Sequence, residues 1–222
     1  MAVSDSARST SILRVIDVDL VAVSKQLARK DKTLGAFIKK VGPCTLSGPI
    51  HESHFESIVF AVIAQQVSAK AADTITFRLL DLVGSPLEPK KVLKKTDEQL
   101  RSVGLSGAKA RTIREFAQAV HSGELDLNAL DEMTDDEVHQ ELTKLWGIGR
   151  WTAEMAMIFR LGRLDVWPVG DLAVRKGFTK IYGLSTVPNE VDFESLADHL
   201  KPYRSAVAWY CWRATDETTQ IW

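Results

Sequence analysis

A chain of 222 residues with 45% hydrophobic content is long enough for one good-sized core, or for two small helical lobes with a cleft between them. Its net charge of −1 argues against a highly basic coat that binds DNA nonspecifically, but it leaves room for a local basic face. The only two cysteines, Cys44 and Cys211, lack Cys-x-x-Cys spacing, which excludes a structural zinc site and a four-cysteine iron-sulfur cluster.

Apolar residues recur at helical spacing along nearly the whole chain, and no segment shows the alternation typical of a β-strand. Residues 1–11 are polar and rich in Ser and Ala, so we expect a disordered tail, with no signal peptide and no membrane span in the chain. Residues 12–222 are predicted to form a single all-α domain of two helical subdomains. Helices are predicted over 17–29, 32–41, 54–65, 69–83, 89–94, 97–102, 107–121, 135–145, 150–161, 172–182, 192–199 and 203–214.

Three Ser/Thr-x-x-Glu/Gln patterns match the capping box, in which a hydroxyl and an acidic or amide side chain satisfy the first backbone N–H groups of a helix. These patterns are Ser53–Glu56, Thr96–Gln99 and Thr134–Glu137. They predict where three of the helices begin, and Ser68 is suited to cap a fourth.

Residues 142–154 read Leu-Thr-Lys-Leu-Trp-Gly-Ile-Gly-Arg-Trp-Thr-Ala-Glu, and Gly147-Ile148-Gly149 sits between two amphipathic segments. This is the arrangement of a helix-hairpin-helix turn that grips a nucleic-acid backbone. Glycines are needed because the chain must reverse sharply and bring bare amide groups up to a phosphate, which a Cβ would obstruct. The next helix is predicted to begin at about Arg150, so its free N–H groups and positive end face the same anion.

Asp171 closes a Pro/Gly loop twenty-two residues after Gly149 and opens another predicted helix, in the sequence Pro-Val-Gly-Asp. Asp is a favourable N-cap, since its carboxylate accepts a bond from the amides of the first turn. Capping is compatible with catalysis at this position, and both roles stay open.

The hairpin, the spacing and the Pro-Val-Gly-Asp loop together resemble the helix-hairpin-helix base-excision DNA glycosylases. Residues 60–72 and 104–111 are similar to the helix-turn-helix and the Lys-bearing turn of the AlkA-type 3-methyladenine DNA glycosylases, and residues 201–212 to their closing helix. The resemblance covers roughly residues 12–215, in the compact form of that family. It implies two helical lobes with a DNA-binding cleft, and double-stranded DNA with alkylated bases as the partner of a monomer.

The resemblance also implies how DNA is held. The turn at residues 65–68 aligns with the loop that inserts a side chain into the duplex, and the choice between Gln66 and Val67 as the wedge stays open, as does a turn that merely ends a helix. Carbonyls of Leu145 and Ile148 are candidates to hold a monovalent cation that bridges to phosphate. The implied DNA-binding residues are Gln65, Gln66, Val67, Ser68, Lys109, Gly147, Ile148, Gly149 and Arg150.

All six tryptophans follow residue 145, an asymmetry that fits an aromatic pocket. Trp151 and Trp212 match positions where AlkA-type enzymes place aromatic walls around the flipped base, whereas we expect Trp146 and Trp209 to pack in the core. An indole face stabilises a cationic base such as 3-methyladenine by about 0.5 to 2 kcal/mol. Met155, at a position where the family often has an aromatic, and Ala173 are the other predicted base-pocket residues.

Bifunctional relatives carry a Lys nucleophile directly after the hairpin, where this chain has Trp151, so the resemblance implies a monofunctional enzyme without AP-lyase activity. Hydrolysis of an N-glycosidic bond passes through an oxocarbenium-like sugar. Asp171 is the predicted catalytic carboxylate, which stabilises that charge and orients or deprotonates the attacking water. An alkylated purine leaves readily because it already carries a positive charge.

No cofactor is expected, neither zinc nor an iron-sulfur cluster, and the predicted location is the cytoplasm at the nucleoid. His54 is expected at the surface, and Arg204 in a structural ion pair. Basic residues at or near the predicted DNA-facing turns are Lys109, Arg111, Arg114, Lys144, Arg150, Arg175 and Lys176. Three alternatives remain: a glycosylase for neutral lesions such as hypoxanthine or ethenoadenine, a non-catalytic binder of damaged DNA, and a helical interaction protein without a DNA role.

Overall fold

The computed structural model describes residues 12–48 and 53–215. The tail predicted for residues 1–11 therefore lies outside the described residues, as does Trp222. The described helices are α1 Leu20–Lys30, α2 Lys32–Val41, α3 His54–Ala64, α4 Ala69–Val83, α5 Pro89–Leu93, α6 Asp97–Ser102, α7 Gly107–Ser122, α8 Asp135–Thr143, α9 Arg150–Phe159, α10 Leu172–Tyr182, α11 Glu190–Phe193 and α12 Arg204–Ala214. Short 3-10 turns lie at Val15–Asp17, Leu127–Asp131 and Asp198–Leu200.

The all-α prediction is confirmed, since the β-structure of the described residues amounts to one isolated bridge between Arg14 and Arg163. The predicted bounds of α2, α4, α6 and α10 agree with the structure to the residue. The helix predicted over 192–199 is wrong: α11 is one turn long and a 3-10 turn follows it. Asn189 caps α11 at the amide of Asp192, which starts the helix earlier than the apolar pattern indicates.

The capping boxes of Thr96 and Thr134 are confirmed, but the box predicted for Ser53 is only half formed. The Ser53 hydroxyl accepts from the amide of Glu56 at 3.1 Å. The Glu56 carboxylate instead accepts from the amide of Leu87 at 2.8 Å in the protein interior. A tertiary hydrogen bond to buried Leu87, two residues before α5, has replaced the local hydrogen bond of the capping box.

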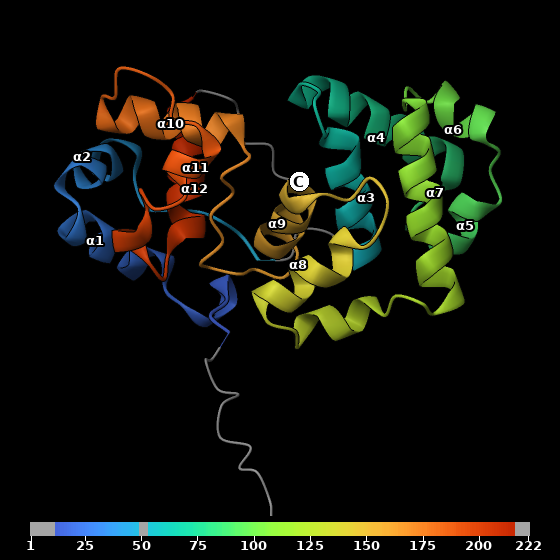
Figure 1. Cartoon of the computed structure of the whole chain (residues 1–222), viewed down its shortest axis with the longest axis horizontal. Coiled ribbons are helices and arrows are strands. Elements are labelled where there is room, and N and C mark those ends of the chain that lie inside the picture. Colours follow the sequence, from blue (N-terminus) through green and yellow to red (C-terminus); the bar gives the residue numbers. More distant parts are fainter. Residues whose placement is uncertain (1–11, 49–52, 216–222) are drawn as a thin grey trace, which may run out of the picture.

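Figure 1 shows two lobes. The helices at both ends of the described chain, α1 and α2 with α10 to α12, pack into one lobe, and α3 to α7 form the other, with α9 packed against α3 and α8 against α9. The helix α3 is buried along its whole length and is the central core element of its lobe. None of the helices in the described residues is long and apolar enough to cross a membrane.

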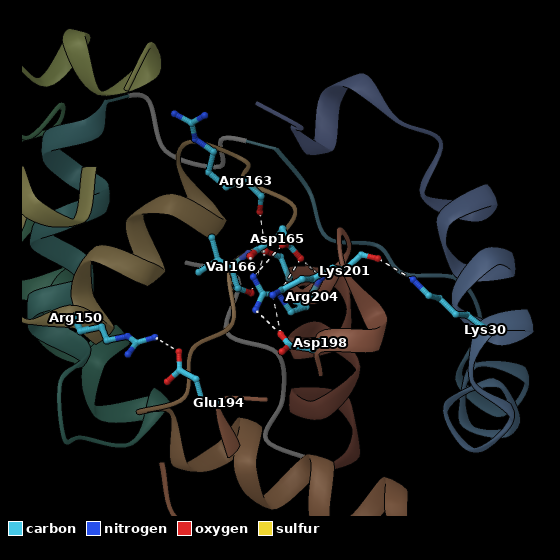
Figure 2. Close-up of polar contacts among 10 residues, drawn as sticks. Lys30, Arg150, Arg163, Asp165, Val166, Glu194, Asp198, Lys201 and Arg204 are labelled. Atoms are coloured by element: carbon cyan, nitrogen blue, oxygen red, sulfur yellow. Dashed lines mark hydrogen bonds and ion pairs between the residues drawn. The ribbon is translucent and has the colours of Figure 1, made fainter. Parts of the chain in front are cut away.

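Polar contacts fix the segments that join the lobes, as Figure 2 shows. The guanidinium of Arg204, at the start of α12, forms two 2.9 Å bonds to the carboxylate of Asp165, between α9 and α10. This paired geometry confirms the structural ion pair expected for Arg204. The Arg150 guanidinium, at the start of α9, reaches the Glu194 carboxylate beyond α11 at 3.1 Å, so it ties one lobe to the other.

Candidate functional site

A cavity of about 840 Å³ lies between the lobes. Its walls come from the turn between α3 and α4, from α9, from the start of α10 and from α12. The predicted catalytic residue Asp171 and the four predicted base-pocket residues all line it: Trp151, Met155, Ala173 and Trp212. The structure thus brings into one cavity side chains that are up to about sixty residues apart in the sequence.

Asp171 is the N-cap of α10 and its side chain is held at both oxygens. Oδ1 accepts from the amide of Val174 at 2.9 Å, and Oδ2 accepts from the indole Nε1 of Trp151 at 2.8 Å. The residue is only 8% exposed, although it lines the cavity. The two bonds fix the orientation of a carboxylate at the cavity wall, so capping and a cavity-facing charge occur together.

Aromatic rings form much of the apolar wall. Trp212 packs on Phe159, with ring centroids 5.5 Å apart, and both rings line the cavity with Trp151. Sequence reasoning missed Phe159. Its position four residues after Met155 on α9 was the available signal, because residues at that spacing share one helix face.

The hairpin between α8 and α9 turns at Gly147, which has a φ of +78°. A Cβ at Gly147 would lie 1.9 Å from the hydroxyl oxygen of Thr112 on α7, so both backbone conformation and packing require glycine there. A Cβ at Gly149 would meet nothing within 4 Å. Gly149 is the N-cap of α9 and contributes no side-chain cap, so the first N–H groups of α9 open toward free space.

Ile148 lies between these glycines and its side chain is buried, at 3% exposure, so only its backbone is available to an anion or a cation. The Leu145 carbonyl accepts from the Ile148 amide at 3.1 Å. A carbonyl oxygen has a second lone pair, so this bond is compatible with a cation at Leu145 and Ile148. The monovalent cation stays a prediction.

The turn between α3 and α4 has a strained backbone at Gln66, whose φ is +56°. Such a conformation costs about 1–3 kcal/mol in a residue with a side chain and tends to occur at functional sites. Gln66, Val67 and Ser68 are exposed, and Ser68 also caps α4 at the amide of Ala71. The two wedge candidates, Gln66 and Val67, therefore both project from the turn, and the choice between them stays a prediction.

Two side chains predicted to contact DNA instead support this turn from within the protein. The Gln65 amide donates to the Gly147 carbonyl at 3.0 Å and to the Thr152 hydroxyl at 2.8 Å. The Lys109 ammonium donates to the carbonyls of Ile63 and Gln65 at 2.7 and 2.6 Å. Partial burial lowers the pKa of Lys109. These bonds join the turn at residues 65–68, called here the wedge turn, to the hairpin and to α7.

Arg150 was predicted to bind DNA, and the structure places its guanidinium between two carboxylates. Besides Glu194, it donates to Glu154 at 2.8 Å. The side chain of Glu154 is nearly buried, and burial raises its pKa to about 7. The Arg150 side chain thus pairs with a nearly buried acid one turn further along α9. Its backbone amide remains part of the open start of that helix.

Three further expectations are settled by burial. Trp209 packs in the core as predicted, at 5% exposure. The core position predicted for Trp146 is wrong: the ring is 43% exposed, with the Arg111 guanidinium 4.1 Å from its centroid. The surface position expected for His54 is wrong as well, since it is buried, with Nε2 3.1 Å from the Asp131 carboxylate.

Comparison with known proteins gives consistent matches. Residues 59–202 match the HhH-GPD superfamily of base excision DNA repair proteins. The alkylbase DNA glycosidase-like protein mag2 of Schizosaccharomyces pombe is 32% identical over 201 residues, which cover 89% of this chain and 94% of that protein. DNA-3-methyladenine glycosylase 1 of the same organism is 32% identical over 72% of each chain.

Solved structures agree with the sequence matches. The 3-methyladenine DNA glycosylase of Schizosaccharomyces pombe in complex with abasic DNA superposes with a TM-score of 0.81 at 29% identity, over 86% of this chain and 95% of that one. A DNA-3-methyladenine glycosidase from Bacillus halodurans has a TM-score of 0.73 at 35% identity, over 87% and 89% of the two chains.

Proposed function

Because this chain belongs to the HhH-GPD superfamily of base excision DNA repair proteins, we propose that it is a monofunctional DNA glycosylase for alkylated purines. It flips 3-methyladenine or 7-methylguanine out of double-stranded DNA and hydrolyses the N-glycosidic bond. The observation that carries the proposal is the carboxylate of Asp171, held at both oxygens on the wall of an aromatic cavity. Relatives named as 3-methyladenine glycosylases support the lesion class.

An enzyme that acts on a base must hold the backbone, fill the gap in the duplex and enclose the extruded base. The open N–H groups at Gly149 and the start of α9 suit a phosphate, since the positive end of the helix favours an anion there. The exposed turn at Gln66 and Val67 supplies the side chain that enters the duplex. The cavity of about 840 Å³ is within the usual range for ligand sites and receives the base.

In the reaction, the bond from C1′ of the sugar to the base nitrogen breaks and its electron pair leaves with the base. The alkylated purine departs neutral, because it was cationic before cleavage. The negative carboxylate of Asp171 stabilises the positive charge that develops on the sugar. Water then adds to C1′ and loses a proton to the carboxylate or to solvent.

Selectivity for charged bases follows from the aromatic wall. The faces of Trp151, Trp212 and Phe159 stabilise a bound cationic purine by about 0.5 to 2 kcal/mol. A neutral purine gains less from the same contact. Lyase chemistry is not proposed, since Trp151 occupies the position after the hairpin Arg and has no amine to attack the sugar. The enzyme is proposed to act as a monomer on DNA at the nucleoid.

The substrate class is tested with a panel of duplexes. Dimethyl-sulfate-treated DNA supplies 3-methyladenine and 7-methylguanine, and synthetic duplexes supply hypoxanthine and ethenoadenine as neutral lesions. We expect release of the methylated purines at a rate well above that of the neutral bases. Release of hypoxanthine or ethenoadenine alone would identify a neutral-lesion glycosylase, and binding without release of any base would identify a damage-binding protein.

A further inference from the structure

Most basic side chains around the cleft are already engaged within the protein. Of the seven basic residues near the predicted DNA-facing turns, six have acidic or carbonyl partners in the described residues. The pairs are Lys109 with the carbonyls of Ile63 and Gln65, Arg111 with Glu115, Arg114 with Asp97, Lys144 with Glu141, Arg150 with Glu154 and Glu194, and Arg175 with Glu190. A phosphate that binds any of these six side chains therefore has to compete with a partner that the side chain already has.

Two lysines on the cavity rim are different. Lys70, in the first turn of α4, and Lys176, on α10, both line the cavity and are both exposed. Across residues 12–48 and 53–215 neither ammonium group makes an ion pair. Uncommitted ammonium groups bind phosphate without first losing a protein partner, so their contribution to DNA affinity is not offset.

The two lysines belong to opposite lobes. Figure 1 shows α4 and α10 on the same side of the molecule, one in each lobe, with the gap between them. Asp171 and Ala173 precede Lys176 at the start of α10, and the wedge turn immediately precedes Lys70. Each lysine is therefore next to a residue that faces the extruded nucleotide, and such a nucleotide carries one phosphate on each side.

We propose that Lys70 and Lys176 form a phosphate clamp that binds the backbone on the two sides of the extruded nucleotide, one lysine from each lobe. This clamp rests on the proposed function, because it assumes that the cavity receives a base from DNA. It supplies charge at the cavity that the hairpin, built from backbone amides, does not. The hairpin fixes one phosphate by geometry, and the lysines attract the strand that enters the cavity.

Phosphate contacts by lysine have a quantitative signature. Each contact releases a counterion, and its loss lowers the slope of log affinity against log salt concentration by about 1. For Lys70→Gln or Lys176→Gln, the ratio of wild-type to variant affinity should therefore shrink about threefold between 50 and 200 mM salt. In the double variant, the slope of log affinity against log salt concentration should fall by twice as much as in either single variant.

The test uses the full chain and a duplex that contains a tetrahydrofuran abasic-site analogue, with binding followed by fluorescence anisotropy at several salt concentrations. Lys90→Gln is the matched control, because Lys90 is exposed on α5 and does not line the cavity. We expect reduced slopes for Lys70→Gln and Lys176→Gln and an unchanged slope for the control. Circular dichroism spectra verify that all variants fold.

Equal slopes for wild type and both cavity variants would overturn the clamp, as would an equal loss of slope in Lys90→Gln, which would indicate a general charge effect. This readout does not depend on base release. If the slopes fall as expected but no base is released from any lesion duplex, the two lysines contact phosphate and the proposed catalysis fails. If bases are released and the slopes stay equal, only the clamp fails.

Discussion

The indole Nε1 of Trp151 donates to Oδ2 of Asp171 at 2.8 Å, across twenty residues of sequence. Trp151 stands where bifunctional relatives would carry an amine nucleophile, directly after the hairpin Arg. Here the side chain orients the carboxylate instead of attacking the sugar. This hydrogen bond thus links α9, which begins at the hairpin proposed to hold DNA, to the carboxylate proposed to stabilise the sugar.

Trp151→Phe tests this link, because it keeps an aromatic wall and removes the N–H donor. A hydrogen bond to a charged group contributes about 1.5–3 kcal/mol, so single-turnover release of 3-methyladenine should slow by about 10- to 100-fold. Affinity for abasic DNA should change little. Unchanged release by the variant would show that the indole bond does not orient Asp171 for the reaction.

Lys109→Met should disturb the wedge turn, since the carbonyls of Ile63 and Gln65 lose their donor. The strained Gln66 backbone is then less firmly held, and we expect a smaller rise in the fluorescence of 2-aminopurine placed beside an abasic-site analogue. Lys109→Arg keeps donors at this position and should recover most of the signal. Equal signals for wild type and Lys109→Met would contradict a supporting role.

Gly147→Ala and Gly149→Ala form a matched pair at the hairpin. The first forces a side chain into positive φ and toward Thr112, so the free energy of unfolding should fall by about 1–3 kcal/mol or more. The second meets no neighbouring atom and should cost less, about 0.5–1 kcal/mol, because alanine is a poorer N-cap residue than glycine.

Both substitutions should weaken DNA binding, Gly147→Ala because it distorts the hairpin and Gly149→Ala because of a direct steric effect. At Gly149 the new methyl group obstructs the approach of a phosphate to the first N–H groups of α9. Urea denaturation and anisotropy binding measured on the same samples separate the two effects. Full DNA affinity in a stably folded Gly149→Ala would argue against phosphate binding at this helix end.

Glu154 predicts a pH dependence of stability. Its folded-state pKa is raised to about 7 by burial, above the usual value of 4.5, so the folded protein retains a proton that the unfolded chain releases between these pH values. The free energy of unfolding should therefore fall as pH rises from 4.5 to 7, by a contribution on the order of 3 kcal/mol. Glu154→Gln should remove most of this fall, which denaturation at several pH values measures. If the free energy of unfolding depends on pH in the same way in the variant and in wild type, Glu154 is not its source.

Local signals in the sequence were sufficient for most of the fold. Capping residues and helix-stopping glycines lie within a few residues of the groups they satisfy, so the bounds of α4 and α10 could be predicted closely. The hairpin and Asp171 were recognisable for the same reason, because their glycines and carboxylate form a compact pattern. The length of α11 was not predictable, since Phe193 is fixed by packing on Trp167, with ring centroids 4.6 Å apart.

The partners of charged groups could not be predicted. Arg150 lies beside the hairpin in the sequence, and nothing local indicates that Glu194, forty-four residues later, occupies its guanidinium. Lys109 likewise binds carbonyls more than forty residues earlier in the chain. Such pairs depend on how the lobes pack, so the sequence alone did not distinguish Lys176, which makes no ion pair with the residues that the structure describes, from basic residues that are already paired.

The catalytic role of Asp171 is tested most directly by comparing wild type with Asp171→Asn on dimethyl-sulfate-treated duplex DNA, with the free bases identified by chromatography. The substitution removes the negative charge and nearly preserves the shape, so affinity for abasic DNA should stay close to that of wild type. We predict that 3-methyladenine and 7-methylguanine appear with wild type and not with the variant. Equal release by both proteins would contradict the assignment of Asp171 as the catalytic carboxylate.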